Sequence, residues 1–258
     1  MTTFLAVTDL HYCLRDDPEA ERRNILSAAK LENIVGSSSK GCDFIIDLGD
    51  TADYQPDCGD QRELAKEVYG IMEKTGLPVC CAIGNHDTSL PKDELTDILH
   101  MPGRYYEFKT ADFNCIVLDA NMNSPETPCP GEEIEWGNTW FDPEQLVFLK
   151  DALARAGKPV LVFCHELFML EYYEQDNPHV IRNRDEAIRL FEESGKVKAV
   201  FSGHYHPGDC VLHNGIYYLA FTALVLHENE SFAVVKADKD RITVEGHDLQ
   251  KSYAFELK

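Results

Sequence analysis

Short apolar runs alternate with segments of helical periodicity through most of the chain, and this alternation is the strongest constraint on its fold. Most of the runs are continuous rather than alternately apolar and polar, which is typical of strands covered on both faces. Strands that alternate with helices predict an α/β domain. The predicted strands are Phe4–Thr8, Phe44–Leu48, Pro78–Ile83, Cys115–Leu118, Val160–Cys164 and Ala199–Ser202.

Four intervening segments place apolar residues near helical spacing. Gln61–Lys74 stops near Gly76 and Pro78, which are residue types that end helices. Asp142 comes directly before Pro143–Ala156 and has the short carboxylate of an N-cap residue. The other two predicted helices are Asp17–Val35 and Asn183–Ser194.

The C-terminal part changes to strands separated by short polar turns. Asn214-Gly215 between two apolar runs is a strong hairpin signal. No linker-like segment precedes these strands, so we expect an antiparallel meander that closes a single domain over residues 1–258. Its predicted strands are Val211–His213, Ile216–Thr222, Ser231–Lys236 and Arg241–His247.

Two segments, at about 121–141 and 170–183, fit neither pattern. Long irregular loops within a compact domain are often functional. An aromatic side chain of these loops can stack on a planar group of a bound molecule, with packing against the protein as the alternative. The aromatic candidates are Trp136, Trp140, Tyr172, Tyr173 and, outside the loops, Tyr205.

The chain carries 45 acidic and 24 basic residues, a formal net charge of −21. Such a surface repels nucleic acid polymers and anionic membranes, so we expect neither as a partner. No secretory signal and no apolar run of about 20 residues is visible, which favours a cytoplasmic location. The nine cysteines include no C-x-x-C pair and are predicted to be reduced thiols. Four of them lie in apolar strand-like runs, namely Cys80, Cys81, Cys115 and Cys164.

Five predicted strands end in residues that can bind metal ions. Ligands of open α/β sheets lie beyond the carboxyl ends of the strands, so residues far apart in the sequence are expected to converge. One histidine after one strand is more often structural, but five such clusters in order rarely arise by chance. The candidate ligands are Asp9, His11, Asp50, Asn85, His165, His204 and His206.

The residue types of this set indicate the metals. Imidazole and carboxylate ligands without thiolate suit transition metals, so we expect two divalent or mixed-valence ions, manganese or iron, with zinc or cobalt as alternatives. In Asp-x-His and His-x-His the two side chains lie on the same side of an extended segment, because side chains alternate along it. Each pair can therefore hold one ion from two directions.

The five clusters resemble the five motifs of the calcineurin-like metallophosphoesterases. They run from residue 9 to residue 206, so the resemblance covers most of the chain. It implies a four-layer α/β/β/α sandwich of two mixed sheets flanked by helices. The motifs are Asp9-x-His11, Gly49-Asp50-x-x-Asp53, Gly84-Asn85-His86-Asp87, His165 and Gly203-His204-x-His206.

The resemblance also implies a role for each motif residue. Asp50 bridges the two ions, His86 protonates the leaving group, Asp87 orients His86, and Asp53 lies beside the ligands. The first ion is assigned to Asp9, His11, Asp50 and His206. The second ion is assigned to Asp50, Asn85, His165 and His204.

The chemistry expected of such a centre is phosphoester hydrolysis. Two ions about 3.5–4 Å apart activate a shared water as hydroxide, which attacks phosphorus in line with the leaving oxygen. The metals and Asn85 stabilise the developing charge, and His86 is a suitable general acid. We therefore expect a hydrolase of a small phosphodiester or nucleotide diphosphate.

Two features distinguish branches of this superfamily. Its phosphoprotein phosphatases carry Arg after the second motif and Glu in the third, where this chain has Tyr54 and Asp87. The segments Tyr105–Phe108, Gln145–Leu149 and Asn183–Phe191 resemble manganese-dependent ADP-ribose/CDP-alcohol diphosphatases. Class III cyclic-nucleotide phosphodiesterases are the other candidate branch. The alternatives are a phosphomonoesterase on a small substrate and a non-catalytic metal-binding scaffold for a protein partner. A scaffold should have lost ligands, whereas this chain keeps all seven.

Overall fold

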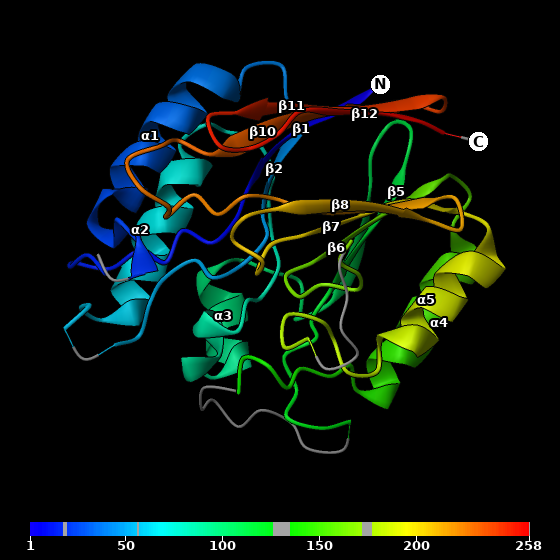
Figure 1. Ribbon diagram of the computed structural model, residues 1–258, viewed down its shortest axis with the longest axis horizontal. Helices are drawn as coiled ribbons and strands as arrows, with labels where there is room; N and C mark the ends of the chain where they lie inside the picture. Colours follow the sequence, from blue (N-terminus) through cyan, green and yellow to red (C-terminus); the bar gives the residue numbers. More distant parts are fainter. Residues whose placement is uncertain (18–19, 56, 126–134, 172–176, 258) are drawn as a thin grey trace.

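The computed structural model describes residues 1–17, 20–55, 57–125, 135–171 and 177–257. Two six-stranded mixed sheets lie face to face, with one helix group outside each sheet (Figure 1). The predicted four-layer sandwich is confirmed. Within the described ranges, no helix is long and apolar enough to cross a membrane.

The first sheet has the order β12-β11-β10-β1-β2-β3. β1 pairs in parallel with β2 and antiparallel with β10, so the N-terminal strand joins the two halves of this sheet. The strands are β1 (Thr2–Val7), β2 (Phe44–Asp47), β3 (Val79–Cys81), β10 (Phe232–Ala237), β11 (Arg241–His247) and β12 (Tyr253–Glu256).

The second sheet has the order β4-β5-β6-β7-β9-β8. Its centre is parallel from β5 to β9, and β4 and β8 pair antiparallel at its two edges. The strands are β4 (Tyr106–Lys109), β5 (Asn114–Leu118), β6 (Val160–Cys164), β7 (Val197–Ser202), β8 (Asp209–His213) and β9 (Ile216–Ala220).

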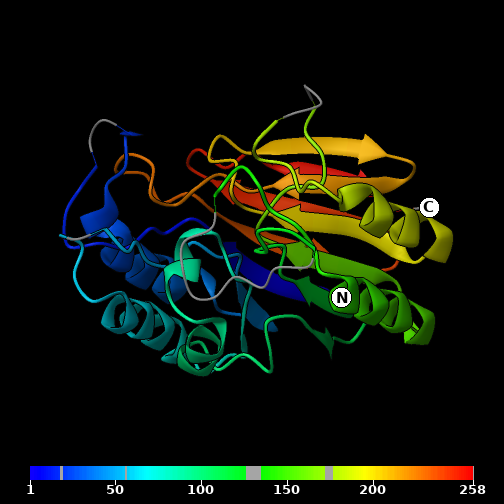
Figure 2. The ribbon, with the colours of Figure 1, turned by 90° about the horizontal axis from the view of Figure 1, so that it is seen from below.

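Helices cover the outer faces of both sheets. α1 and α2 pack against the first sheet through a buried cluster that includes Leu5, Leu31 and Val68. α4 and α5 pack against the second sheet on the opposite side of the molecule (Figure 2). The helices are α1 (Ser27–Ser38), α2 (Gln61–Glu73), α3 (Lys92–Ile98), α4 (Pro143–Arg155) and α5 (Arg184–Ser194), with the 3₁₀ turns η2 (Asn24–Leu26) and η3 (His86–Ser89).

Aromatic rings fill the space between the two sheets. Phe4 of β1 contacts Phe163 of β6 and Phe201 of β7 edge to face, each with ring centroids 5.6 Å apart. Aromatic pairs at this distance add about 0.5–1.5 kcal/mol beyond the burial of their area. This packing holds the carboxyl ends of β1, β6 and β7 in a fixed relation, and those ends carry the candidate ligands.

Most predicted elements are confirmed within a few residues. Asp142 caps α4 as predicted, because its Oδ1 accepts a hydrogen bond from the backbone N–H of Gln145 at 2.8 Å. Asn214 and Gly215 both have positive φ, at 46° and 82°, as the predicted hairpin turn between β8 and β9 requires. The strands β4 and β12 and the helix α3 were not predicted.

Two predictions about the elements are wrong. The helix expected over Asp17–Val35 begins only at Ser27, because Asp17 and Arg22 pair their backbones in a short antiparallel bridge before it. The C-terminal strands do not form one meander. β8 and β9 join the second sheet beside β7, whereas β10 to β12 join the first sheet beside β1, so the chain crosses between the sheets after β9.

Candidate metal centre

The candidate ligands lie on loops that leave the carboxyl ends of five strands. Backbone hydrogen bonds connect these loops, from Asp9 N–H to Gly49 O at 3.0 Å, from His11 N–H to Asp50 O at 2.8 Å and from Gly203 N–H to His165 O at 3.0 Å. Four of the candidate ligands have a positive φ that non-glycine residues rarely adopt, which stores strain at this site. They are Asp9 (52°), His11 (45°), Asp50 (54°) and His204 (63°).

The ligand atoms form two adjoining groups. Asp9, His11 and His206 bring one atom each within 4.8 Å of one another, and so do Asp50, His165 and His204. Asp50 lies between the groups, because its Oδ2 is 3.5 Å from His11 Nε2 and 3.2 Å from His165 Nε2. The structure therefore brings six of the seven candidate ligands into two adjoining groups, and the seventh, Asn85, lines the same cavity as Asp50 and His204.

Several of these atoms are buried without any hydrogen-bond partner among the described residues. A buried polar atom without a partner costs about 1–3 kcal/mol, so a group of them that faces one space needs an explanation. A pair of cations coordinated by these oxygens and nitrogens would supply it. The unpartnered atoms are Asp9 Oδ1, Asn85 Oδ1, His165 Nε2 and His204 Nε2.

Two histidines are oriented by bonds at their other ring nitrogen. Nδ1 of His165 donates to the carbonyl oxygen of Leu48 at 2.8 Å, and Nδ1 of His11 lies 2.8 Å from Asp53 Oδ1. A proton held at Nδ1 leaves the lone pair of Nε2 directed at the cluster, which is the usual arrangement of a metal-binding histidine. The residues present thus fit two transition-metal ions.

Electrostatics in the cluster favour ionised carboxylates. Burial would raise the pKa of Asp9 and Asp50, but the neighbouring histidines hold both well below the ordinary value. Burial would likewise lower the pKa of His165, but Asp50 and Asp9 raise it well above its usual range. For His204, burial and the charge of His165 both lower the pKa. The carboxylates are therefore ready to bind cations.

His86 forms a third group with His11 and Asp53, in which one atom of each residue lies within 4.8 Å of the others. Its Nδ1 lies 2.8 Å from Asp53 Oδ1, the oxygen that also contacts His11. The other Asp53 oxygen accepts a hydrogen bond from Asn24 Nδ2 at 3.0 Å. Asp53 therefore holds the rings of both histidines.

Asp87 occupies a different place from the one expected. Its buried carboxylate accepts hydrogen bonds from the backbone N–H groups of Asp50 (2.9 Å), Thr51 (3.0 Å) and Gly84 (2.9 Å). It thus joins the second and third motif loops, and Asp53 rather than Asp87 contacts the ring of His86. Burial and the neighbouring charge of Asp50 raise the pKa of Asp87.

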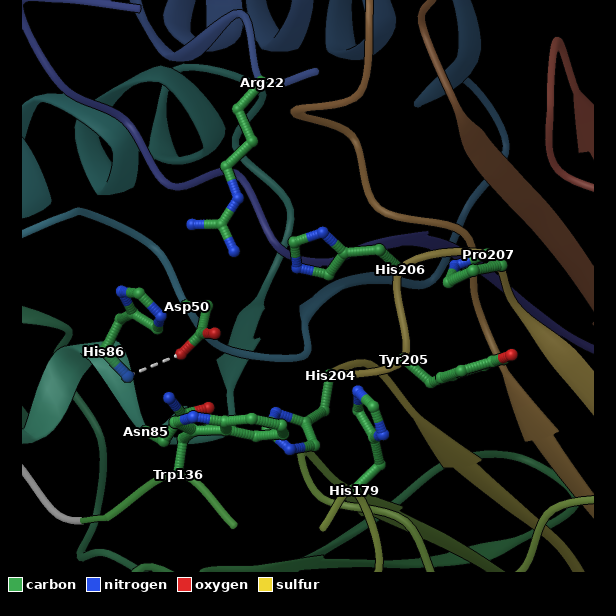
Figure 3. Close-up of a pocket in the computed structure, with 10 residues that line it drawn as sticks. All are labelled: Arg22, Asp50, Asn85, His86, Trp136, His179, His204, Tyr205, His206 and Pro207. Atoms are coloured by element: carbon green, nitrogen blue, oxygen red, sulfur yellow. Dashed lines mark hydrogen bonds between the residues drawn. The ribbon is translucent and has the colours of Figure 1, made fainter. Parts of the chain in front are cut away.

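A cavity of about 420 Å³ opens over the ligands (Figure 3). Trp136, His179 and Tyr205 form one side of it, with the His179 ring centroid 5.2 Å from that of Trp136 and 5.1 Å from that of Tyr205. Arg22 extends into it from the opposite side. The lining residues are Arg22, Asp50, Asn85, His86, Trp136, His179, His204, Tyr205, His206 and Pro207.

Sequence reasoning assigned no role to Arg22 or His179. His179 lies in the irregular loop over residues 170–183, and this position is the only sequence feature that could have indicated a role for it. Arg22 lies inside a segment that was predicted to be helical. Trp140 is not among the residues that line the cavity. Its Nε1 donates a hydrogen bond to Asn138 Oδ1 at 3.0 Å. Tyr172 and Tyr173 lie outside the described residues.

The cysteines follow the prediction only in part. Cys80, Cys81, Cys115 and Cys164 are free, and burial raises the pKa of each thiol. The expectation of reduced thiols is wrong for Cys13 and Cys58, which form a disulfide. Their Cα atoms are 4.5 Å apart although 45 positions separate them in the sequence, because the loops after β1 and β2 lie side by side.

The contact between Gly84 and Asp50 predicts the effect of a single methyl group. A Cβ at position 84 would lie 2.2 Å from both the backbone nitrogen and Oδ1 of Asp50. We expect Gly84→Ala to lower the free energy of unfolding by about 1–3 kcal/mol in urea titrations, and to lower metal content. The control is Gly70→Ala in α2, where nothing lies within 4 Å of the new Cβ and a gain of about 0.5–1 kcal/mol is expected. Equal stability of the two variants would contradict the prediction.

The two facing sheets and the grouped candidate ligands agree with the resemblance that the motifs indicated. Residues 2–208 match the model of the calcineurin-like phosphoesterase family. The chain belongs to this family.

Curated relatives and a solved structure agree with this assignment. The serine/threonine-protein phosphatase CPPED1 of Danio rerio is 29% identical over 181 residues, which are 67% of this chain and 57% of that protein. A probable cyclic nucleotide phosphodiesterase of Psychrobacter arcticus is 22% identical over 232 residues, 82% of this chain and 76% of that protein. A dimetal phosphatase structure from Danio rerio superposes with a TM-score of 0.82 at 16% identity, covering 100% of this chain and 99% of that one, and thus shares the fold.

Proposed function

We propose that this chain is a dinuclear metal-dependent hydrolase of small phosphodiesters or nucleotide diphosphates. The observation that carries the proposal is the group of buried, unpartnered ligand atoms, of which those of Asn85 and His204 belong to residues that line a cavity of about 420 Å³. A cavity of this size suits a small molecule. The similarity to a probable cyclic nucleotide phosphodiesterase supports a substrate of this class.

Two manganese or iron ions would be held as the family motifs assign them. Such ions, when bound, supply Lewis acidity and a nucleophilic water near neutral pH. The ligands proposed for the first ion are Asp9, His11, Asp50 and His206. The ligands proposed for the second ion are Asp50, Asn85, His165 and His204.

His86 is proposed to give a proton to the leaving oxygen. Because the Asp53 carboxylate lies 2.8 Å from Nδ1, a proton is favoured there, and Nε2 is the ring nitrogen left to donate. Asp53 is proposed to orient the His86 ring through this contact, in the role first expected of Asp87. The part proposed for Asp87 is to hold the Asp50 and Gly84 loops in position through their backbone amides.

The aromatic side of the cavity is proposed to bind the organic substituent of the substrate. Trp136 lines the cavity and is 46% exposed, so its ring is accessible to a bound molecule. With His179 and Tyr205 it provides flat surfaces on which a planar group, such as a nucleotide base, can stack.

A phosphomonoesterase is the second candidate, because one relative is named as a serine/threonine-protein phosphatase. Tyr54 stands where the phosphoprotein phosphatases have arginine, which favours the diesterase. A substrate comparison separates the two activities.

The first test compares hydrolysis of bis-p-nitrophenyl phosphate and p-nitrophenyl phosphate by the manganese-loaded protein. We expect activity that falls to background with EDTA, returns with Mn²⁺ and prefers the diester. The melting temperature, measured in parallel, should rise with Mn²⁺ because a ligand that binds only the folded state stabilises it. Preference for the monoester would favour the phosphatase. Two bound ions without hydrolysis of either ester or of a nucleotide diphosphate would favour the scaffold.

A further inference from the structure

Arg22 is held in place by backbone pairing on both sides. Its N–H donates to Asp17 O at 2.9 Å and its carbonyl accepts from Asp17 N–H at 3.2 Å. On the other side it bridges to Leu226, in the segment after β9, where the neighbouring Val225 N–H donates to Asp9 O at 3.1 Å. The base of this side chain is therefore fixed relative to the metal centre.

The guanidinium of Arg22 lacks the partners that arginines in this chain otherwise have. Nε is buried without a hydrogen-bond partner, and no ion pair to Arg22 is found among the described residues. Each of the other nine arginines, all of them described, contacts a carboxylate, an amide or a carbonyl oxygen. An arginine without an acidic partner is unexpected in this chain, because it has 45 acidic residues and only 24 basic ones.

The side chain points into the catalytic cavity. Figure 3 shows the guanidinium reaching between His86 and His206, across the cavity from Trp136. The positive charge of Arg22 therefore lies beside the candidate metal ligands, although Arg22 is not one of them.

We infer that Arg22 binds the non-bridging oxygens of the substrate's phosphoryl group. A guanidinium presents planar N–H donors that match phosphate oxygens in pairs, and its charge persists at every working pH. It occupies the side of the cavity opposite the aromatic surface, so the phosphoryl group would lie between the guanidinium and the metal ligands. This assignment rests on the proposed function and adds to it a specific anion-binding residue that none of the five motifs contains.

The test uses the manganese-loaded protein and a matched neighbour. Arg23 is the control, because it is 38% exposed and paired with Asp16 and Glu228, so R23Q removes the same charge outside the cavity. We expect R22Q to bind inorganic phosphate at least about tenfold more weakly by calorimetry, and to lose about 10²–10³ in kcat/KM on the preferred ester. R23Q should stay within about twofold of wild type on both measures. Manganese content should be unchanged in both variants.

R22K distinguishes the planar contact from charge alone. A lysine keeps the charge but not the paired donors, so about a tenfold loss in kcat/KM is expected. Phosphate affinity of R22Q equal to that of R23Q would overturn the inference, and so would wild-type behaviour of R22K. If the wild type binds phosphate but hydrolyses no ester, the proposed function fails, while a weaker R22Q affinity still supports Arg22 as the phosphate contact.

Discussion

Asp50→Asn is expected to remove metal binding and hydrolysis together. The Asp50 carboxylate lies between the two ligand groups, 3.5 Å from His11 Nε2 and 3.2 Å from His165 Nε2, and is the only side chain proposed to bind both ions. An amide of the same shape carries no charge and offers one oxygen instead of two. We expect metal content, measured by atomic emission after dialysis, to fall well below two per chain and kcat to fall by about 10³ or more.

Asp57→Asn is the control for this substitution, since Asp57 belongs to the same loop, is exposed and lies outside the ligand set. It should retain both ions and full activity. Circular dichroism of the Asp50→Asn protein shows whether a loss of metal results from the missing ligand or from unfolding. A folded Asp50→Asn protein that keeps two ions per chain would show that Asp50 is not the bridge.

His86→Ala is expected to lower kcat by about 10²–10⁴ while both ions remain bound. His86 lines the cavity and contacts Asp53, but it belongs to neither of the two groups assigned to the ions. Removal of the ring therefore takes away a proton donor without removing a ligand. Metal analysis and steady-state kinetics on the same preparation measure the two effects.

The leaving group provides a sharper test of the role of His86. A p-nitrophenolate leaves without much help from an acid, whereas an alkoxide needs a proton, so the loss in His86→Ala should be larger for an alkyl ester than for a nitrophenyl ester. His213→Ala, an exposed histidine of β8, should lose nothing on either substrate. Equal losses on both esters would exclude His86 as the general acid.

The sequence alone predicted the fold class of this protein, which the structure confirms, and a set of candidate ligands, which the structure brings close together. Continuous apolar runs such as Val160–Cys164 predicted buried strands, and a polar cluster after each of five runs predicted one site at the strand ends. These signals are local, because the period of the side chains, the turn residues and their order can each be recognised within a short segment of the sequence.

Only the tertiary structure decided how distant segments meet. β10 pairs with β1 and β9 with β7, so the C-terminal strands divide between two sheets, a choice that depends on packing rather than on strand pattern. The Cys13–Cys58 disulfide and the contact of Asp53 with His86 likewise join loops through space. His179 reaches the cavity from an irregular loop, and Arg22 reaches it from a segment whose helical spacing predicted a helix that begins only at Ser27. The placement of both side chains depends on three-dimensional contacts that no local pattern encodes.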